Sequence, residues 1–175
     1  MNAVDCIPLY DFETAIESAV KTIFTNHEIE AFTSFDAPEM ERVRPRVEIQ
    51  FQTGAATGHR STVDDVYRLD AFTGVCSVQV ITNTSDAETE TDSPSNAGAR
   101  AHAQYRAVVR FICGELETTL TDDDAGADTL LPNHSVNRFF ESGTSPTIHH
   151  ESGVLVSQLN FEVHFNIRPA AWPTT

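Results

Sequence analysis

The sequence predicts an α+β fold: a single antiparallel sheet of about four to five strands, with two main helices packed on one face. Two segments place apolar residues at helical spacing, and several others alternate between apolar and polar residues. Alternation leaves one face of a strand in water, which is typical of antiparallel rather than parallel sheets. Because the 175 residues show no repeat and no domain boundary, we expect a single domain over residues 1–175.

The composition excludes several classes of protein. The chain has 11 basic and 26 acidic residues, so its formal net charge is −15. Such a surface repels phosphate backbones and anionic lipids, so we expect no specific DNA binding and no membrane partner. No stretch approaches the roughly 20 apolar residues of a membrane helix, and the first residues lack a secretory pattern. We expect a globular protein made in the cytoplasm.

The first helix is expected over residues 11–27. Asp11 is a suitable cap for its start, and His27 suits its end. Apolar residues keep to one helical stripe throughout: Phe12, Ala15, Ile16, Ala19, Val20, Ile23 and Phe24. The segment is therefore predicted to be amphipathic, with one buried face.

The first strand is expected at residues 47–52, after a less regular segment over 28–45. Its apolar residues alternate with polar ones, as in a half-buried strand. Residues 54–58 begin and end with glycine and are expected to terminate the strand.

Two more strands are expected over residues 67–72 and 75–82. Thr73 and Gly74, between them, predict a turn or a bulge. In the first of these strands the alternation places Phe72 on the side opposite the other apolar residues.

Two acidic segments, 83–96 and 117–128, are expected to be flexible loops, because they are rich in carboxylates and poor in large apolar side chains. Between them a second helix is predicted, with an apolar side formed by Ala101, Tyr105, Val108, Val109, Ile112 and Leu116. Residues 133–140 fit either a short helix or an edge strand. Residues 142–153 are expected to form a turn and loop.

The last strand is expected over residues 154–168, where alternation is longest. At ~3.3 Å per residue it would span roughly 50 Å, whereas a compact domain of this length is about 40 Å across. The strand must therefore bend sharply or project past its own domain. Pro169 ends the pairing and begins an extended tail over 169–175, which holds Trp172.

No motif indicates catalysis. The chain has no phosphate-binding loop, dinucleotide fingerprint, nucleophile elbow or zinc-protease motif. A metal-dependent hydrolase using His134, His149 or His150 with Asp122–Asp124 is a remote alternative, because adjacent histidines on an extended chain point in opposite directions. We expect no catalytic residue, no metal and no cofactor. A ligand-binding α+β module is a third possibility.

Three cysteines at wide spacing indicate neither a disulfide framework nor a zinc site. We expect Cys76 and Cys113 to be buried, unreactive thiols, since both lie in apolar patterns; the third is Cys6.

Arg42, Arg44 and Arg46 form a row along the start of the first expected strand, in a strongly acidic chain. One interpretation is that the guanidinium groups pair with carboxylates of a second copy. The other is that they pair within the chain or are solvated.

The polar face of the predicted sheet is uniformly uncharged or acidic and rich in amides. Its main residues are Glu48, Gln50, Gln52, Gln79, Gln158, Asn160 and Glu162. This face is either ordinary solvent-exposed surface or the lining of a water-filled lumen through which a polyanion passes without binding.

Two parts of the chain resemble the tail-terminator and neck proteins of long-tailed bacteriophages. One is Leu-Asp-Ala-Phe-Thr-Gly at 69–74, followed by Ser-Val-Gln-Val at 77–80. The other is the ending from Ser152 through Phe165-Asn166-Ile167-Arg168-Pro169 to Ala171-Trp172-Pro173. A first helix before a Pro-Arg-Val strand at 45–47 fits the same plan.

The resemblance implies a homo-oligomeric ring, usually of six copies, that closes the tail tube at full length. Such a virion protein contacts the tail-tube protein and the head-completion or connector proteins, and DNA passes through its lumen. We expect the contacts with copies or partners to include Arg42, Arg44, Arg46, Arg168 and Trp172. Another neck or tail-tube component, such as a tail-completion protein, is the nearest alternative.

Overall fold

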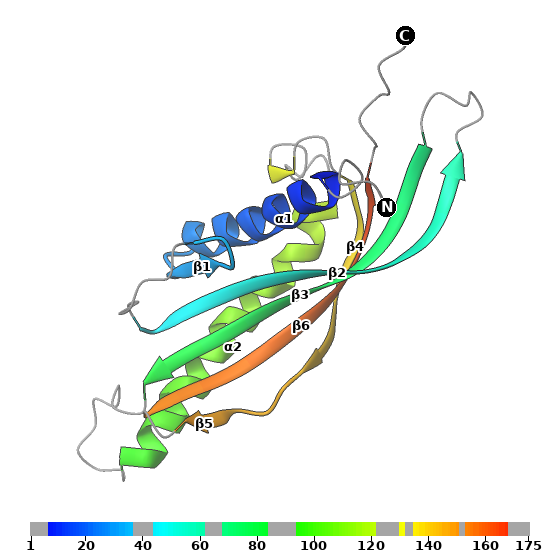
Figure 1. The fold of residues 1–175 in the computed structure, drawn as a ribbon. Helices are drawn as coiled ribbons and strands as arrows, with labels where there is room; N and C mark the ends of the chain where they lie inside the picture. Colours follow the sequence, from blue (N-terminus) through cyan, green and yellow to red (C-terminus); the bar gives the residue numbers. More distant parts are fainter. Residues whose placement is uncertain are drawn as a thin grey trace.

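The computed structural model of the chain describes residues 7–36, 44–61, 68–83, 94–121, 130–131, 135–150 and 153–167. The elements in these residues are α1 (Ile7–Asn26), β1 (Ala31–Thr33), β2 (Arg46–Ser61), β3 (Arg68–Asn83), α2 (Pro94–Thr121), β4 (Ser135–Thr144), β5 (Ile148–His150) and β6 (Val154–Ile167). Both helices lie on the same side of one long sheet (Figure 1). The expected α+β class is confirmed.

The sheet has the strand order β1–β2–β3–β6–β4, and β5 also pairs with β6, beyond the end of β4. All pairs are antiparallel except β1–β2, in which residues 31–33 lie parallel to residues 47–49. The expectation of a purely antiparallel sheet is therefore wrong at this edge. Residues 34–45 supply the long connection that a parallel pair requires.

β2 and β3 are longer than expected. β2 continues through residues 54–58, where the glycines were expected to end it, and β3 runs through Thr73 and Gly74 without a turn. The expected end of the strand at 54–58 is wrong, and so is a turn at Thr73 and Gly74; the other alternative, a bulge, is found beside them, because the register shift begins at Thr53, the partner of Gly74. The irregularity lies instead in β2, where the register shifts twice between Thr53 and Gly58, so that the strand bulges and continues.

Gly74 leaves room for the ring of Phe51. A Cβ at this position would collide with Cζ of Phe51 and lie 2.9 Å from the carbonyl oxygen of Gln52. Phe51 in turn contacts Phe165 edge-to-face, with ring centroids 5.8 Å apart. Phe72 stacks on the same Phe165 ring, at 5.7 Å, so its expected place on the opposite side of the sheet is wrong.

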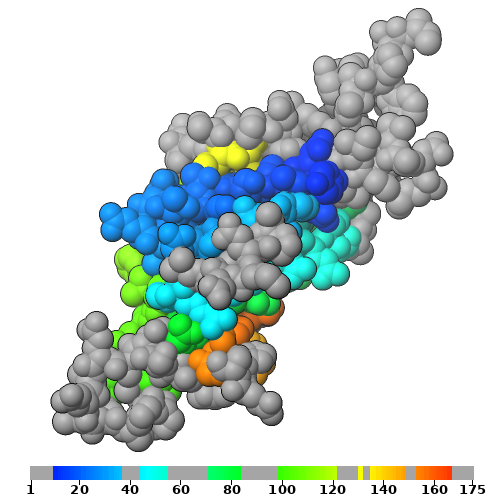
Figure 2. All heavy atoms as spheres, turned by 60° about the vertical axis from the view of Figure 1, so that its left-hand side comes forward, coloured from blue at the N-terminus to red at the C-terminus, as the bar shows by residue number. Residues whose placement is uncertain are grey.

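The two helices cover one face of the sheet, as expected, and the core lies between the helices and the sheet. α1 packs chiefly on β2 and β1, and α2 chiefly on β4 and β3. In Figure 2, α1 forms a broad part of the surface. Its predicted stripe is confirmed as core, with Ala15 partly buried and these residues fully so: Phe12, Ile16, Ala19, Val20, Ile23 and Phe24.

The ends of α1 follow from local chemistry. The helix begins at Ile7, earlier than expected, and proline is tolerated in the first turn, where Pro8 stands. After Asn26, Glu28 takes a left-handed conformation with φ of 59°. The N–H of Ile29 then donates to the carbonyl of Phe24 at 3.0 Å, which closes the helix end.

α2 takes up parts of both segments that were expected to be acidic loops. Asn83 ends β3, residues 94–96 begin α2, and residues 117–121 are helical. The expected loop limits are therefore wrong. The other residues of both segments lie outside the described part of the chain.

The buried stripe of α2 differs in part from the expected one. Val109, Ile112 and Leu116 are buried as predicted. Val108 is half exposed, and His102 lies in the buried stripe instead. Among the described residues, neither helix is apolar over a length sufficient to cross a membrane.

The C-terminal strands form the second edge of the sheet. Of the two alternatives for residues 133–140, the strand is correct, because β4 covers 135–144 with its apolar residues Val136 and Phe139 buried. β5 lies within 142–153, so the expectation of an irregular segment there is wrong in part. β6 confirms the long last strand.

β6 pairs with β3 along its whole length, from Val154 opposite Asn83 to Ile167 opposite Asp70. The strands curve and twist along their course, and the paired ends of β2 and β3 extend beyond α1 (Figure 1). β6 itself bends, which is one of the two alternatives expected for it. The tail over 169–175 lies outside the described residues.

Candidate functional site

The sheet face opposite the helices collects the polar residues that the sequence placed on one side. The strand registers align them in three neighbouring rows across β2, β3 and β6: Glu48–Gln79–Gln158, Gln50–Ser77–Asn160 and Gln52–Val75–Glu162. Their neighbours along the strands, such as Val47, Val78 and Leu159, are buried under the helices. We call the residues of these three rows the polar face; Val75, which is 42% exposed, is its one apolar member.

Neutral side chains at the centre of the polar face hydrogen-bond to one another. Gln79 Nε2 donates to Gln158 Oε1 at 3.4 Å, and Gln158 Nε2 donates to Ser77 Oγ at 3.1 Å. Ser77 Oγ donates to Asn160 Oδ1 at 3.0 Å, and Gln158 Nε2 also donates to that oxygen. These contacts hold the amides in place without adding charge.

Charged groups lie at the two ends of the polar face, each carboxylate beside a basic side chain. Arg46 Nε donates to Glu48 Oε1 at 2.8 Å. Towards the other end, His164 Nε2 lies 2.7 Å from Glu162 Oε1. The charge of Glu48 is therefore partly compensated within the chain, and Glu162 has a hydrogen-bonding partner.

The described members of the arginine row contact the chain itself. Arg44 Nη1 donates to Asn83 Oδ1 at the end of β3, at 2.7 Å, and Arg46 pairs with Glu48 as described above. The other expected interface residues, Arg42, Arg168 and Trp172, lie outside the described residues. Their contact with a second copy or a partner stays a prediction.

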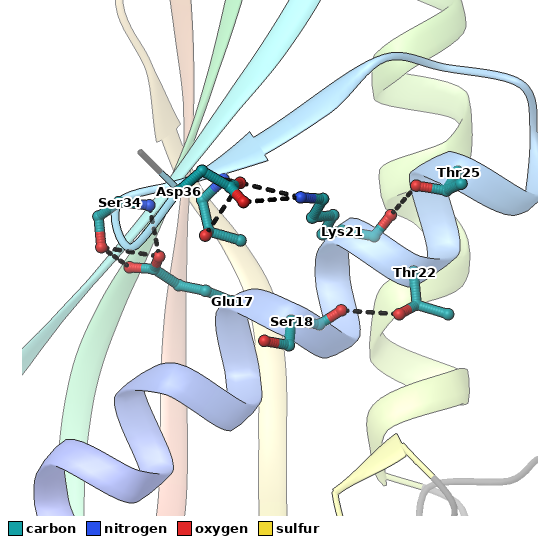
Figure 3. Close-up of polar contacts among 8 residues, drawn as sticks. Glu17, Ser18, Lys21, Thr22, Thr25, Ser34 and Asp36 are labelled. Carbon is teal, nitrogen blue, oxygen red and sulfur yellow. Dashed lines mark hydrogen bonds and ion pairs between the residues drawn. The ribbon is translucent and has the colours of Figure 1, made fainter. Parts of the chain in front are cut away.

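A buried carboxylate that the sequence analysis did not single out closes the edge of β2. Glu17 of α1 is fully buried. Its Oε1 accepts a hydrogen bond from the N–H of Phe51 at 2.6 Å, and its Oε2 accepts one from the N–H of Ser34 at 2.8 Å. The Ser34 hydroxyl also donates to this carboxylate (Figure 3). Because β1 ends at Thr33, Glu17 takes over where a longer β1 would have paired with β2.

Glu13, one helical turn earlier, continues this arrangement. Its Oε1 accepts hydrogen bonds from the Thr53 hydroxyl and, at 3.3 Å, from the Thr53 N–H. Two carboxylates one turn apart therefore meet two N–H groups of one strand edge, those of Phe51 and Thr53. The sequence signal is a pair of glutamates at i and i+4 beside an apolar stripe, and the result is an edge protected from further pairing.

Asp36 ties the end of β1 to α1. Its two oxygens lie 3.0 and 2.9 Å from Nζ of Lys21 (Figure 3), and Oδ2 also accepts from the N–H and hydroxyl of Thr33. Partial burial alone would raise the pKa of Asp36. The hydrogen bonds from Thr33 and the charge of Lys21 outweigh it and hold this pKa below its ordinary value of 3.8.

His102 is a second buried polar group that sequence reasoning missed. It lies on α2, and its Nδ1 is 2.9 Å from the hydroxyl of Thr82 in β3. Its Nε2 is 3.1 Å from the hydroxyl of Ser157 in β6. The sequence does hold one sign of this contact: Ser157 is the one polar residue on the apolar side of the last strand. A buried hydroxyl needs a hydrogen-bonding partner, and His102 is that partner.

The described part of the chain contains no metal-binding cluster and no reactive thiol. No group of three His, Cys, Asp or Glu side chains there is placed to hold a metal ion. Asp122–Asp124 and His134 lie outside the described residues, and so do the side chains of His149 and His150.

Cys76 and Cys113 are buried and free, as expected, and Cys6 is not described. Burial raises the pKa of both thiols, that of Cys113 to about 12 with a further contribution from Glu141.

Comparison with protein-family models and with the sequences of curated proteins finds no match for this chain. The functional interpretation rests on the residues and their geometry.

Proposed function

We propose that the chain is a structural virion protein that forms a ring at the head–tail neck of a long-tailed bacteriophage. The ring, of six copies, terminates the tail tube and joins it to head-completion proteins. DNA passes through its lumen, and the chain acts by its shape without catalysis. The polar face lines that lumen.

The observation that carries the proposal is the hydrogen-bonded amide network of the polar face. A wall along which DNA slides must be wet and must not hold phosphate groups, which lysine and arginine bind. Gln79, Gln158 and Asn160 present neutral groups that already satisfy one another. Arg46, at the end of this face, lies against the carboxylate of Glu48.

The segments that carry the family resemblance give a second support. Residues 69–80 lie in β3 and residues 154–167 form β6, and these strands pair with each other in the middle of the sheet. Stretches far apart in the sequence thus contribute to one surface. A resemblance confined to one local motif would not bring two distant stretches of the sequence together in one surface.

The proposal is tested by the mass and the position of the protein. The purified chain should form a closed oligomer in native mass spectrometry, and an antibody against it should label the neck of intact particles in electron microscopy. Label at the end of the tail tube next to the head supports a terminator, and label along the tube or on the head side supports another neck or tube component. A monomer that is absent from particles contradicts the proposal.

A further inference from the structure

Arg138 of β4 lies on the same side of the sheet as the polar face, one strand beyond it. Its cross-strand partner is His164 of β6. Phe140, two residues further on, is opposite Glu162, a member of the polar face. Directly opposed residues of an antiparallel pair point to the same side of the sheet, and Phe139, between the two, is buried on the helix side instead. The side of the sheet that holds the polar face therefore continues onto β4.

The guanidinium group of Arg138 is positioned by an aromatic ring. Its Cζ lies 5.0 Å from the ring centroid of Phe140, within the distance of a cation–π contact. The ring of Phe140 in turn lies 6.0 Å from the ring of His164. A guanidinium group that rests on a ring keeps a defined place and still presents the N–H groups at its edge to an acceptor.

The carboxylates that flank Arg138 on β4 and β6 have other partners. Glu162 Oε1 lies 2.7 Å from His164 Nε2. Glu141 pairs with Arg110 of α2, at 3.1 Å. Among the described side chains, no carboxylate lies within ion-pair distance of Arg138. An exposed guanidinium group of this kind is available to an anion from outside the chain.

We propose that Arg138 is the residue with which each copy contacts the phosphate backbone of the DNA in the lumen. This inference rests on the proposed function and adds a phosphate contact that the amides of the polar face do not supply. A guanidinium group binds phosphate oxygens through two parallel N–H bonds, and one such group per copy gives a circle of cations around the lumen. Salt screens these contacts and they carry no sequence information, so the DNA can slide while it is held.

Substitutions at two arginines test the contact. Arg138→Gln removes the charge from β4, and Arg110→Gln, on a helix that covers the other side of the sheet, is the matched control. The binding of a short fluorescent DNA duplex to the assembled ring is measured by anisotropy at several salt concentrations. We expect Arg138→Gln to weaken binding at low salt about 10-fold or more and to flatten its salt dependence, because every copy loses a phosphate contact. Arg110→Gln should bind as wild type does.

A second variant keeps the charge and alters only its support. Phe140→Leu removes the ring on which the guanidinium group of Arg138 rests, and it should weaken DNA binding about threefold with little change in the salt dependence. Circular dichroism and native mass spectrometry check that each variant is folded and assembled. If Arg138→Gln does not assemble, Phe140→Leu and Arg138→Lys decide the result, and wild-type affinity in both would overturn the inference.

The shape of the DNA tests whether the contact lies in the lumen. A linear duplex can enter a closed ring, whereas a covalently closed circle of the same sequence cannot. The preassembled wild-type ring should therefore bind the linear DNA and not the circle. Equal binding of both would place the contact outside the lumen and overturn the inference.

The outcomes separate this inference from the proposed function. A wild-type chain that stays monomeric overturns both. A wild-type ring that binds no DNA at low salt, or whose affinity is the same in an assembled Arg138→Gln ring, overturns only the inference. So does an equal loss in Arg110→Gln, because the effect would then follow from net charge and not from the place of Arg138.

Discussion

Glu17 of α1 and Phe51 of β2 are joined by a hydrogen bond of 2.6 Å from the backbone N–H of the strand to a fully buried carboxylate. The same carboxylate accepts from Ser34, just beyond the end of β1. A side chain of the helix thus completes the edge of the sheet that β1 leaves unpaired. The contact explains why an acidic residue lies in the buried layer between helix and sheet.

Glu17→Leu should be strongly destabilising, because it leaves the buried N–H of Phe51 and the partly buried N–H of Ser34 without their acceptor. We expect a loss of about 2–4 kcal/mol in the free energy of unfolding, measured by urea titration. Glu17→Gln retains one acceptor oxygen and should lose less. Ser18→Ala, at an exposed neighbouring position, is the control and should change the stability by less than about 0.5 kcal/mol. Equal stability of Glu17→Leu and wild type would contradict the assigned role.

Two glycines should respond in opposite ways to the same substitution. Gly74→Ala forces a methyl group into the ring of Phe51 and should cost about 1–3 kcal/mol. Gly114→Ala lies in α2, where the added Cβ meets nothing within 4 Å, and should stabilise the protein by up to about 1 kcal/mol. Thermal unfolding of the two variants decides this. Combining Gly74→Ala with Phe51→Leu should recover part of the loss, and strict additivity would show that the ring is not the cause.

Acid should weaken the contact between Asp36 and Lys21. Because the pKa of Asp36 is lowered in the folded chain, its contribution is fully present above the unfolded value near 3.8 and is lost as the pH falls through the folded pKa. The stability difference between wild type and Asp36→Asn should therefore be largest near neutral pH and shrink below pH 4. Urea titrations from pH 6 to pH 3 measure it, and a difference that grows towards low pH would refute the direction.

Replacing His102 alone should destabilise the protein more than replacing it together with its two hydroxyl partners, Thr82 and Ser157. His102→Leu leaves the hydroxyls of Thr82 and Ser157 buried without their ring partner, and we expect a loss of about 2–4 kcal/mol. The triple variant with Thr82→Val and Ser157→Ala removes all three polar groups and should regain most of it. Chemical unfolding gives the comparison. A triple variant no more stable than His102→Leu would show that the unpaired hydroxyls are not the cause of the loss.

Periodicity predicted the elements whose environment repeats along the chain. α1 and β6 keep one face in the core for their whole length, so every third or fourth residue in α1, and every second one in β6, carries the same signal. β1 has three residues and runs parallel to β2, which leaves no periodicity to detect. The turn that was one alternative at Gly74 is absent, because this glycine instead leaves space for the ring of Phe51 from the neighbouring strand.

The candidate site was predictable to a similar degree and for the same reason. Alternation placed Gln79, Gln158 and Asn160 on one face, and the strand registers then brought them together. The edge contact of Glu17 and the buried His102 depend on which elements pack together, and this information is not local in the sequence. Exposure of Val108 likewise follows from the direction in which α2 faces the sheet.

Positive charge on the polar face should slow the passage of DNA if that face lines the lumen of a ring. Lysines at Gln79→Lys and Gln158→Lys would add two cations at the centre of the face, where phosphate contacts bring a strong dependence on salt. Particles that carry this double variant should assemble but release DNA more slowly at low salt, and regain the wild-type rate as salt rises. The variant Gln79→Glu with Gln158→Glu changes the same two positions, keeps the size of both side chains and adds no phosphate contact, so its release should equal that of wild type. DNA release that is identical in all three particles at every salt concentration would mean that DNA does not run along this face. Two cations beside a phosphate backbone would otherwise slow its release at low salt.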